Sequence, residues 1–495
     1  MFRDSYYDSQ SNFVVEALDH GIPSDHFSRF VVRFVDTFSF FIEEDIEKNK
    51  KGRKGYDDLE MMKLIFYAFS EGVTSPRMIV EFAKYHQIYQ YVSNRIEPSE
   101  STIRRFLREK GYLFNKLLGC TLIFAREVCM TDFEHCAIDG TYKKAHNSKY
   151  NVIHKKDAET LLKYYQGVYI SEEEISKLKR PALKLLKRTD LNDEEKLDLL
   201  YDVKTAFTIG EQNTVPLNDV EARWMHNKSG NNEISYNIQS AVDTKSKLIC
   251  ALNITQSPTD HYEIPDIVNK LIGNLGQKPE KISADTIYHN IISFQYFNRK
   301  NIDGIIVDRK QTKTNKGKLN KNPYHKDHFT YNEKTDEFTC PENQKLTYHY
   351  EYTTYKKGIP TIKRIYQNYN ACKNCKVRNK CTTRTHRQIT ETGGKLALQM
   401  KTKMKKDEYK EEYKKRSSTV EAPFGTLKTF YNINQIPSIG KHHTLEILEA
   451  FSTTYNLKII YNKQHQIYDE TTNTKTFIQQ MEHQLNLCLK TKTTK

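Results

Sequence analysis

Apolar side chains recur at spacings of three and four residues in the first part of the chain, between residues 24 and 111. This spacing marks the buried face of an amphipathic helix. Ser75-Pro76 and Ser99 stand where further helices would start, because serine caps a helix and proline fits its first turn. The pattern therefore predicts a domain of short helices joined by tight turns. The apolar positions of two of these helices are Phe27, Phe30, Val31, Phe34 and Phe38, then Leu59, Met62, Ile65, Phe66 and Phe69.

Strand-like patterns begin near residue 135. Residues 135–139 form a short apolar run that ends in an aspartate. Residues 234–255 contain two β-rich runs around a polar turn, which predicts a hairpin. Two more short runs, 281–284 and 304–307, each precede an aspartate and enclose a helical stretch at 291–300. Strand, helix and strand in this order predict a parallel α/β unit.

Two segments interrupt the α/β pattern. Residues 155–210 are helical and highly charged, which predicts an inserted helical arm. The aromatic, β-rich stretch between residues 340 and 372 predicts a small ribbon. Residues 420–461 then follow as helix, loop and helix. The sequence thus predicts an α/β protein with a helical N-terminal domain, a helical insertion and a small β-rich insertion.

The composition limits the classes of protein to which the chain can belong. Its 495 residues are 37% hydrophobic, which suits a sizeable core in about two to four structural units. No apolar run reaches the roughly 18 residues of a membrane span, and the N-terminus lacks the apolar stretch of a signal peptide. Nine cysteines are too few for a disulfide framework in a chain of this length. We therefore expect a cytoplasmic protein with no membrane partner.

The net charge of +15 points to a polyanionic partner, most often nucleic acid. Arg104 and Arg105 lie on the last helix of the N-terminal domain, which is either a helix-turn-helix DNA reader or a packing domain with a solvated basic face. Residues 309–326 hold seven Lys and Arg and no acid, with Lys316 and Lys318 among them. This segment is either a solvated linker or an arm that contacts phosphates, and the other nucleic-acid signals favour the arm.

Three carboxylates stand where the predicted elements can bring them together. Asp139 ends one strand, Asp285 ends another, and Glu421 opens a helical segment. The carboxyl ends of parallel strands meet at one crevice of an α/β sheet. Carboxylates crowded there repel one another unless a cation neutralises them, which suits hard divalent ions such as Mg²⁺. Two such ions about 4 Å apart can activate a water or a 3′-hydroxyl for phosphodiester chemistry.

The sequence around each acid is more specific than the spacing. Residues 137–141 read AIDGT, residues 284–288 read ADTIY, and residues 420–428 read VEAPFGTLK. Three acidic motifs in this order and with these flanks resemble a DDE transposase, most closely the IS1182-type group within the broad IS4-like superfamily. Residues 55–106 are similar to the helical N-terminal domain of these transposases, and residues 236–243 resemble their central hairpin.

The resemblance implies an RNase H-like fold in which Asp139, Asp285 and Glu421 bind two Mg²⁺ or Mn²⁺ ions. It also implies cleavage of DNA at the transposon ends and strand transfer into target DNA. The partners would be the terminal inverted repeats and the target, and the protein would act on them as a homodimer or higher oligomer associated with the nucleoid.

Many of these transposases carry a signature of Tyr, Arg, Glu and Lys around the third acid, matched here by Tyr413, Arg416, Glu421 and Lys428. The gap between Arg416 and Glu421 is one residue longer than usual, so the sequence leaves open whether Arg416 reaches the active site. Lys428 lies seven residues after Glu421, two helical turns along the same face. It either holds a DNA phosphate near the metals or is a surface lysine of an amphipathic helix.

A second constellation consists of Cys340, Cys372, Cys375 and Cys381. Four thiolates can close a tetrahedral zinc site, and a CxxC pair is typical of one. The alternative is a set of reduced cysteines without a ligand. The clustering of four of the nine cysteines favours structural zinc, and similar cysteines occur in the corresponding insertion of the transposases that the chain resembles.

We therefore predict a helical DNA-binding domain over residues 1–125 and an RNase H-like catalytic domain in two parts, 126–310 and 411–465. Residues 311–410 would hold the basic arm and the cysteine cluster, and residues 466–495 would form a tail. Two alternatives to a transposase remain. One is a transposase-derived DNA-binding protein without catalysis, and the other is a metal-dependent nuclease without strand transfer.

Overall fold

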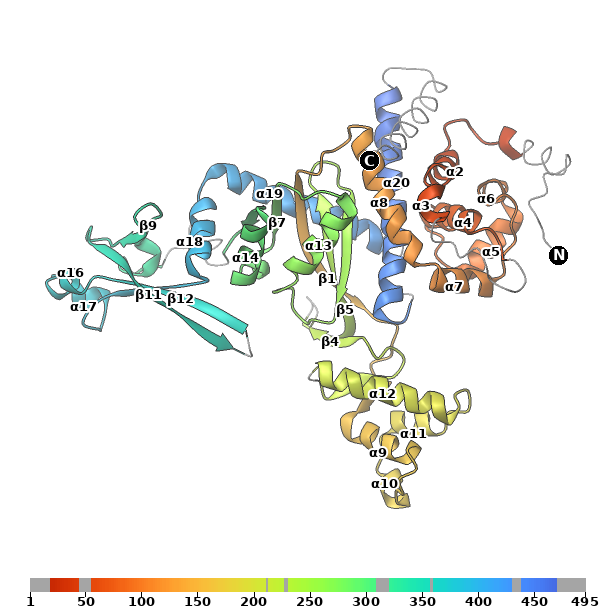
Figure 1. Cartoon of the computed structure of the whole chain (residues 1–495), viewed down its shortest axis with the longest axis horizontal. Helices are drawn as coiled ribbons and strands as arrows, with labels where there is room; N and C mark the ends of the chain where they lie inside the picture. The colour runs from red at the N-terminus through yellow and green to blue at the C-terminus, as the bar shows by residue number, and fades with distance from the viewer. Residues whose placement is uncertain are drawn as a thin grey trace.

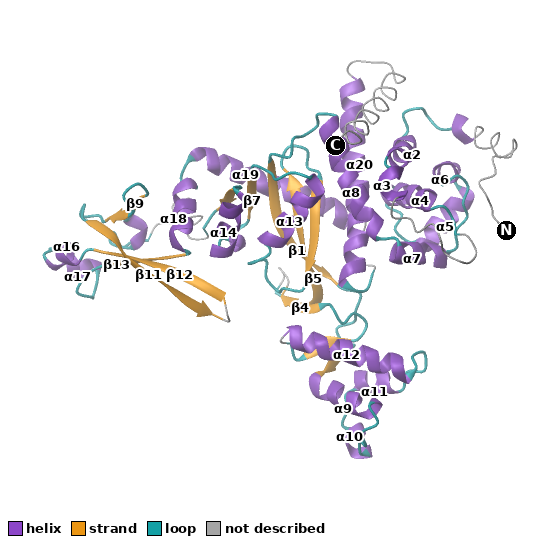
Figure 2. Ribbon diagram, in the orientation of Figure 1, coloured by secondary structure: helices purple, strands orange, loops and turns teal. Residues whose placement is uncertain are grey.

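The computed structural model describes residues 18–43, 55–210, 212–226, 230–308, 320–356, 359–429 and 438–469. In these ranges the chain forms a helical N-terminal part, a central mixed sheet with helices, a helical arm and a second, smaller sheet (Figure 1; Figure 2). No helix in the described ranges is long and apolar enough to cross a membrane.

Short helices make up the N-terminal part, as the apolar spacing predicts. Asp57 caps α4 by accepting a hydrogen bond from the N–H of Leu59 at 2.8 Å. Ser99 caps α7 through the N–H of Thr102 at 3.2 Å, and Pro76 occupies the first turn of α5. The polar caps set the helix starts, and the apolar faces form the core. The helices are α2 (Phe27–Thr37), α3 (Ser39–Glu43), α4 (Asp58–Ser70), α5 (Pro76–Tyr85), α6 (Gln87–Val92) and α7 (Glu100–Glu109).

The central sheet contains both antiparallel and parallel strands. Its order is β4–β5–β1–β7–β8, and β6 also pairs with β5. Strand β5 is antiparallel to β1 and β6, whereas β7 and β8 run parallel to β1 and to each other. The predicted hairpin and the predicted parallel unit are therefore both present. The strands are β1 (His135–Lys144), β4 (Arg223–His226), β5 (Asn232–Asp243), β6 (Ile249–Thr255), β7 (Lys281–Ala284) and β8 (Asp303–Ile306).

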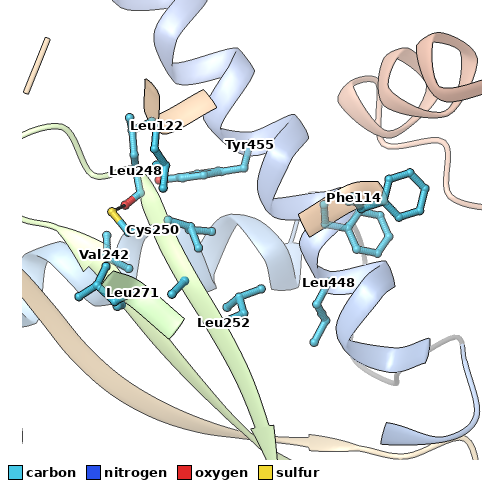
Figure 3. Close-up of a cluster of buried hydrophobic side chains, with 14 of the residues drawn as sticks. Phe114, Leu122, Val242, Leu248, Cys250, Leu252, Leu271, Leu448 and Tyr455 are labelled. Atoms are coloured by element: carbon cyan, nitrogen blue, oxygen red, sulfur yellow. Dashed lines mark hydrogen bonds between the residues drawn. The ribbon is translucent and has the colours of Figure 1, made fainter. Parts of the chain in front are cut away.

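Helices from distant parts of the chain pack against this sheet. Helix α14 (Ile291–Lys300) connects β7 to β8, and α13 (Ile264–Leu275) packs on β6 and β5. Helix α19 (Asp407–Thr429) packs across β1, β5, β7 and β8. Helices α8 (Tyr112–Glu127) and α20 (Lys441–Asp469) pack on each other and on β6. Buried side chains of α8, α13 and α20 pack with those of β5 and β6 in the cluster that Figure 3 shows. The labelled residues are Phe114, Leu122, Val242, Leu248, Cys250, Leu252, Leu271, Leu448 and Tyr455.

One buried amide fixes α20 to the sheet. The Asn456 side chain accepts a hydrogen bond from the N–H of Ile249 and donates one to its C=O, each at 2.9 Å. Backbone groups at a buried strand edge need such partners, because an unpaired polar group away from water is costly. At Ile249 of β6, the Asn456 side chain thus makes the two hydrogen bonds that a neighbouring strand would otherwise make.

The helical arm has a core of its own. Residues 155–210 form four helices, as predicted, and a two-stranded stem joins them to the sheet domain. Their apolar side chains pack together in a cluster separate from the main core. The elements are β2 (Val152–His154), α9 (Lys155–Tyr165), α10 (Glu172–Ser176), α11 (Arg180–Leu186), α12 (Asp193–Gly210) and β3 (Thr214–Pro216).

The predicted ribbon is an antiparallel sheet in the order β13–β12–β11–β10–β9. Figure 1 shows it at one end of the molecule, beyond α18. Lys401 of α18 pairs with Asp308, which follows β8, at 3.1 Å and with Glu391 of β13 at 2.5 Å, and so links the two sheets. The elements are β9 (Thr330–Asn332), β10 (Glu337–Thr339), β11 (Lys345–Lys356), β12 (Ile359–Gln367), α16 (Tyr369–Lys373), α17 (Arg378–Cys381), β13 (Gln388–Thr392) and α18 (Gly394–Lys403).

Two sequence predictions are wrong in detail. Asp139 lies inside β1 rather than at its end, because β1 continues through Lys144 by pairing with β5. Glu421 lies inside α19 rather than at the opening of a helical segment. The first turns of α19 read DEYKEEYKKR and carry few apolar residues, so the apolar spacing does not reveal them.

Candidate active site

Two of the predicted acids lie next to each other on neighbouring strands. Ile138 of β1 pairs with Ala284 of β7 in parallel register, so the residues that follow them, Asp139 and Asp285, stand side by side. The Asp285 side chain accepts a hydrogen bond from the N–H of Thr286 at 2.7 Å and thereby caps a short 3-10 turn, Thr286–Tyr288. Both carboxylates reach solvent, with 24% and 42% of their side chains exposed.

Helix α19 places a cation between these two acids. Arg416 Nη1 lies 3.7 Å from Asp139 Oδ2, and its Nη2 lies 3.7 Å from Asp285 Oδ1. The Tyr413 hydroxyl donates to Asp285 Oδ1 at 3.5 Å. Burial raises the pKa of Tyr413, and the Arg416 guanidinium opposes that rise. The longer gap between Arg416 and Glu421 therefore does not keep Arg416 away from the first two acids.

The third acid lies further along the same helix. Glu421 is exposed, and its Oε1 accepts a hydrogen bond from the Ser417 hydroxyl at 2.8 Å. Arg416, Ser417 and Glu421 follow one another over little more than one helical turn, so one rigid element carries both the arginine and the acid. Lys428 is in the last turn of α19, and its side chain is outside the part of the chain that the structure describes.

A buried histidine ties α19 to the sheet. His135 Nδ1 of β1 lies 2.9 Å from Glu412 Oε2 of α19, and its Nε2 lies 3.1 Å from the Ser283 hydroxyl of β7. Burial lowers the pKa of His135, and the Glu412 carboxylate opposes that effect. His135 lies four residues before Asp139 and Ser283 two before Asp285, so these side chains share one face of the sheet.

Sequence reasoning misses this anchor. The even spacing of His135 from Asp139 and of Ser283 from Asp285 was the available signal, since residues at even spacing share a strand face. The partner, Glu412, is 277 residues away from His135 along the chain and is one of several acids in a charged helix. No local pattern distinguishes it from its neighbours.

A second polar network lies on the opposite face of the sheet. The side chains of Asn237 and Gln239 each donate to Asp260 Oδ1 at 2.7 Å. The Tyr288 hydroxyl, at the end of the turn that Asp285 begins, donates to Gln239 Oε1. All four side chains are buried. Burial raises the pKa of Tyr288 well above its usual value, and the Asp260 charge adds to that rise.

This network explains the glycine after Asp139. A Cβ atom at Gly140 would lie 2.4 Å from Asp260 Oδ1 and 2.6 Å from Gln239 Nε2. Only glycine leaves room for hydrogen-bonded side chains so close to the backbone. The Asp-Gly pair thus presents a carboxylate on one face of β1 and an open backbone on the other.

Asp139 and Asp285 could share a divalent cation. In the described ranges, no group of three or more His, Cys, Asp or Glu side chains is arranged to hold a metal ion. Asp139 and Asp285 nevertheless offer the hard oxygen donors that Mg²⁺ and Mn²⁺ take, and one guanidinium already lies 3.7 Å from both. The pair therefore fits a cation, whereas Glu421 would have to move toward it.

The four cysteines of the second constellation surround one cavity. Cys340, Cys372, Cys375 and Cys381 line a cavity of about 30 Å³, which has room for a water molecule. The N–H of Gln344 donates to the Cys340 thiol at 3.3 Å. Burial raises the pKa of the Cys381 thiol, in opposition to a nearby arginine. The fold thus brings together cysteines that are up to 41 positions apart, without closing them into a ready ligand group.

The predicted DNA contacts are described only in part. Arg104 and Arg105 are exposed on α7, and Arg104 Nη2 pairs with Glu100 at 2.6 Å. Lys316 and Lys318 lie outside the described residues, as does most of the basic arm.

Comparison with known protein families gives two matches. Residues 339–461 match the family described as "Transposase DDE domain". Residues 16–109 match "Transposase domain (DUF772)". The first match contains Glu421, Arg416 and the four clustered cysteines, and the second contains α2 to α7, whereas Asp139 and Asp285 lie between the matched segments.

No curated protein and no solved structure matches the chain. The two family matches support a DDE transposase, with DNA as its partner. They do not distinguish the IS1182-type group from other DDE transposases.

Proposed function

We propose that the protein is a DDE transposase with an RNase H-like catalytic domain, in which Asp139, Asp285 and Glu421 are the catalytic acids. The order β6–β5–β1–β7–β8, with three antiparallel strands followed by two parallel ones, supports this fold. The observation that carries the proposal is the pair Asp139 and Asp285 around Arg416. Two acids from parallel strands meet there, and the helix that supplies the third crosses beside them.

The reaction would be cleavage of a phosphodiester bond at the transposon end, followed by attack of the freed 3′-hydroxyl on target DNA. Two Mg²⁺ or Mn²⁺ ions, when bound, would supply charge stabilisation and an activated water or hydroxyl. Asp139 and Asp285 would hold them, and Glu421 would complete the set after a shift of its exposed side chain. Arg416 would then be free to contact a DNA phosphate, because its guanidinium suits phosphate as well as carboxylate.

His135 and Glu412 would set the geometry of this site without contacting DNA. Their contact holds α19 on β1 and β7, on the face that carries both acids. A catalytic constellation needs such support, since a displacement of about 1 Å can cost about 100-fold in rate.

DNA would be bound through several basic surfaces. Arg104 and Arg105 on α7 are proposed to contact the terminal inverted repeats, and Lys428, Lys316 and Lys318 to contact phosphates closer to the reacting strand. A homodimer or higher oligomer on DNA would bring two transposon ends together. The proposed setting is the nucleoid.

The cysteine cluster is proposed to hold a structural zinc ion. The shared cavity and the CxxC pair support this proposal. Purified Cys372→Ser/Cys375→Ser protein should contain no stoichiometric zinc by elemental analysis, whereas Cys129→Ser, which alters an exposed cysteine outside the cluster, should retain it. Equal zinc content in both variants would reject the site.

The activity is tested with Mg²⁺ and DNA that carries the inverted repeats flanking the coding region. The wild type should cleave at the repeat and join the end to target DNA. Asp139→Asn should abolish both steps, because it removes one ligand charge with little change in shape. The control is Asp132→Asn, which removes a surface ion pair with Lys245. This variant should still cleave the repeat and join its end to target DNA.

Two outcomes would contradict the proposal. Cleavage without joining would identify a metal-dependent nuclease. Binding of the repeats without cleavage at any Mg²⁺ or Mn²⁺ concentration would identify a DNA-binding protein without catalysis.

A further inference from the structure

One segment of the smaller sheet is strongly basic. Residues 345–387 contain eleven Lys and Arg and a single acid, a net charge of +10 against +15 for the whole chain. The same residues include six tyrosines. Basic and aromatic residues together are typical of surfaces that bind nucleic acid.

The β11–β12 hairpin within this segment has two different faces. On one face, Arg364 lies over the ring of Tyr348 at 4.1 Å and pairs with Glu351 at 3.1 Å. Arg364 is buried there and also pairs with Asp336. Glu351, the one acid of the segment, is therefore paired with Arg364 on this face.

The opposite face is open and aromatic. Tyr350 and Tyr352 are 45% and 41% exposed, and their ring centroids lie 6.0 Å apart at an angle of 32°. Lys363, the register partner of Tyr352 on β12, holds its ammonium 5.8 Å from the centre of that ring. On β11 and β12 this face also carries the buried side chain of Ile365, the register partner of Tyr350, and it carries no acid.

We propose that Tyr350, Tyr352 and Lys363 form a stacking site for unpaired DNA bases. Two neighbouring exposed rings on one strand can receive two successive bases, since stacking on aromatic side chains requires unstacked bases and tolerates any sequence. Lys363 would contact the phosphate between them. The site rests on the proposed function, which produces unpaired and free DNA ends at the transposon boundary.

Charge favours a nucleic acid over a protein as the occupant. A face that binds protein would suit an apolar core with a polar rim, whereas this segment carries a net charge of +10. An intact duplex is a poor occupant of the tyrosines, because its bases already stack on one another. Unpaired DNA satisfies both the rings and the charge.

The experiment measures binding of the full chain to a thymine-only single strand of about 16 nucleotides. Tyr350→Leu and Tyr352→Leu should each weaken binding by about 5- to 100-fold, because each removes one stacking partner. Tyr355→Leu is the matched control. Tyr355 lies on the same strand and is 72% exposed, but it points to the opposite face, so its loss should leave the affinity unchanged.

Two further measurements use the same protein. Lys363→Gln should reduce the slope of log Kd against log salt by about 0.7, the contribution of one phosphate contact on a single strand. Photo-crosslinking to a strand that contains iodouracil should attach Tyr350 or Tyr352, identified by mass spectrometry of the peptide.

The inference and the proposed function fail in different ways. If the wild type binds the strand but Tyr350→Leu, Tyr352→Leu and Tyr355→Leu bind it equally well, the stacking site is wrong and the transposase assignment is unaffected. If the wild type cleaves no repeat DNA, the proposed function fails whatever the strand affinity. Crosslinks confined to other peptides would also overturn the stacking site.

Discussion

Gly140→Ala tests how the fold supports the first acid. The new methyl carbon would lie 2.4 Å from Asp260 Oδ1 and 2.6 Å from Gln239 Nε2. Neither side chain can turn away into solvent, because both are buried and each is hydrogen-bonded in the same network. The substitution must therefore displace β1 or break the hydrogen bonds of a buried carboxylate.

The cost follows from these contacts. Overpacking of a buried site costs about 1 to 3 kcal/mol, and a buried carboxylate that loses hydrogen bonds costs about 1 to 3 kcal/mol more. Alanine recovers about 0.5 to 1 kcal/mol, since glycine is the less favourable residue in a strand. We expect Gly140→Ala to lower the free energy of unfolding of the central sheet by about 3 kcal/mol.

The chain offers a selective reporter for this measurement. Trp224 is its only tryptophan, lies on β4 and pairs with β5 of the central sheet. Trp224 Nε1 also donates to the Thr214 hydroxyl of β3 at 2.9 Å. Urea unfolding followed by tryptophan fluorescence therefore reports on the central sheet and on the stem of the helical arm, and not on the smaller sheet. The control is Gly273→Ala in α13, where a Cβ meets nothing within 4 Å. It should be neutral or stabilising by up to about 1 kcal/mol.

A double variant decides whether Asp260 is the cause. In Gly140→Ala/Asp260→Ala the obstructing carboxylate is absent. The double variant should therefore lose less free energy of unfolding than the sum of the losses of the two single variants, by at least about 1 kcal/mol. The reasoning is refuted if Gly140→Ala unfolds at the same urea concentration as Gly273→Ala. Strict additivity of the double variant would refute the role of Asp260.

Three further predictions use the same fluorescence reporter. Burial lowers the pKa of His289 to about 4, so its contribution to stability is complete above pH 6.5 and is lost as the pH falls through about 4. Between pH 7 and pH 4, the free energy of unfolding of the wild type should fall by about 3 kcal/mol more than that of His289→Leu. Equal falls in the two proteins would contradict this prediction. Arg416→Gln removes the guanidinium that lies between the carboxylates of Asp139 and Asp285. In metal-free buffer the variant should have a free energy of unfolding about 1 kcal/mol lower than that of the wild type. Added Mn²⁺ should raise this free energy more in the variant than in the wild type. An equal rise in both would exclude competition between Arg416 and a cation. Tyr288→Phe leaves the side-chain oxygen of Gln239 without its donor and should cost about 1 to 3 kcal/mol, with faster hydrogen exchange in the peptide 281–290. The control, Tyr142→Phe, loses only a bond to the carbonyl of Pro258 at 3.1 Å and should leave that peptide unchanged.

The smaller sheet shows where the sequence misleads about faces. Tyr348, Tyr350 and Tyr352 alternate along β11, and a regular strand would place all three on one face. The register shifts between Tyr348 and Tyr350, and this irregularity places Tyr348, which is itself 41% exposed, on the face of Arg364. A bulge of this kind depends on the pairing strand, so the alternation alone could not predict the open pair.

The sequence by itself determined the local elements and the chemical motifs. Helix caps, apolar spacing and turn residues act within a few positions of one another, which is why the N-terminal helices, the hairpin and the parallel unit could be predicted. The flanks of Asp139, Asp285 and Glu421 led to the prediction of the three acids for the same reason. Element bounds in the charged part of α19 could not be predicted, because that helix is held by contacts to the sheet rather than by an apolar periodicity of its own.

Only the tertiary structure decided which side chains meet. Arg416 reaches Asp139 and Asp285 across 277 and 131 positions of the chain, and Glu412 reaches His135 across 277. Asp260 explains Gly140 only when β1, β5 and the loop after β6 are packed together. These contacts depend on how strands and helices are stacked, and the burial that drives the stacking is shared by the whole core. No single stretch of sequence therefore carries the information that assembles the site.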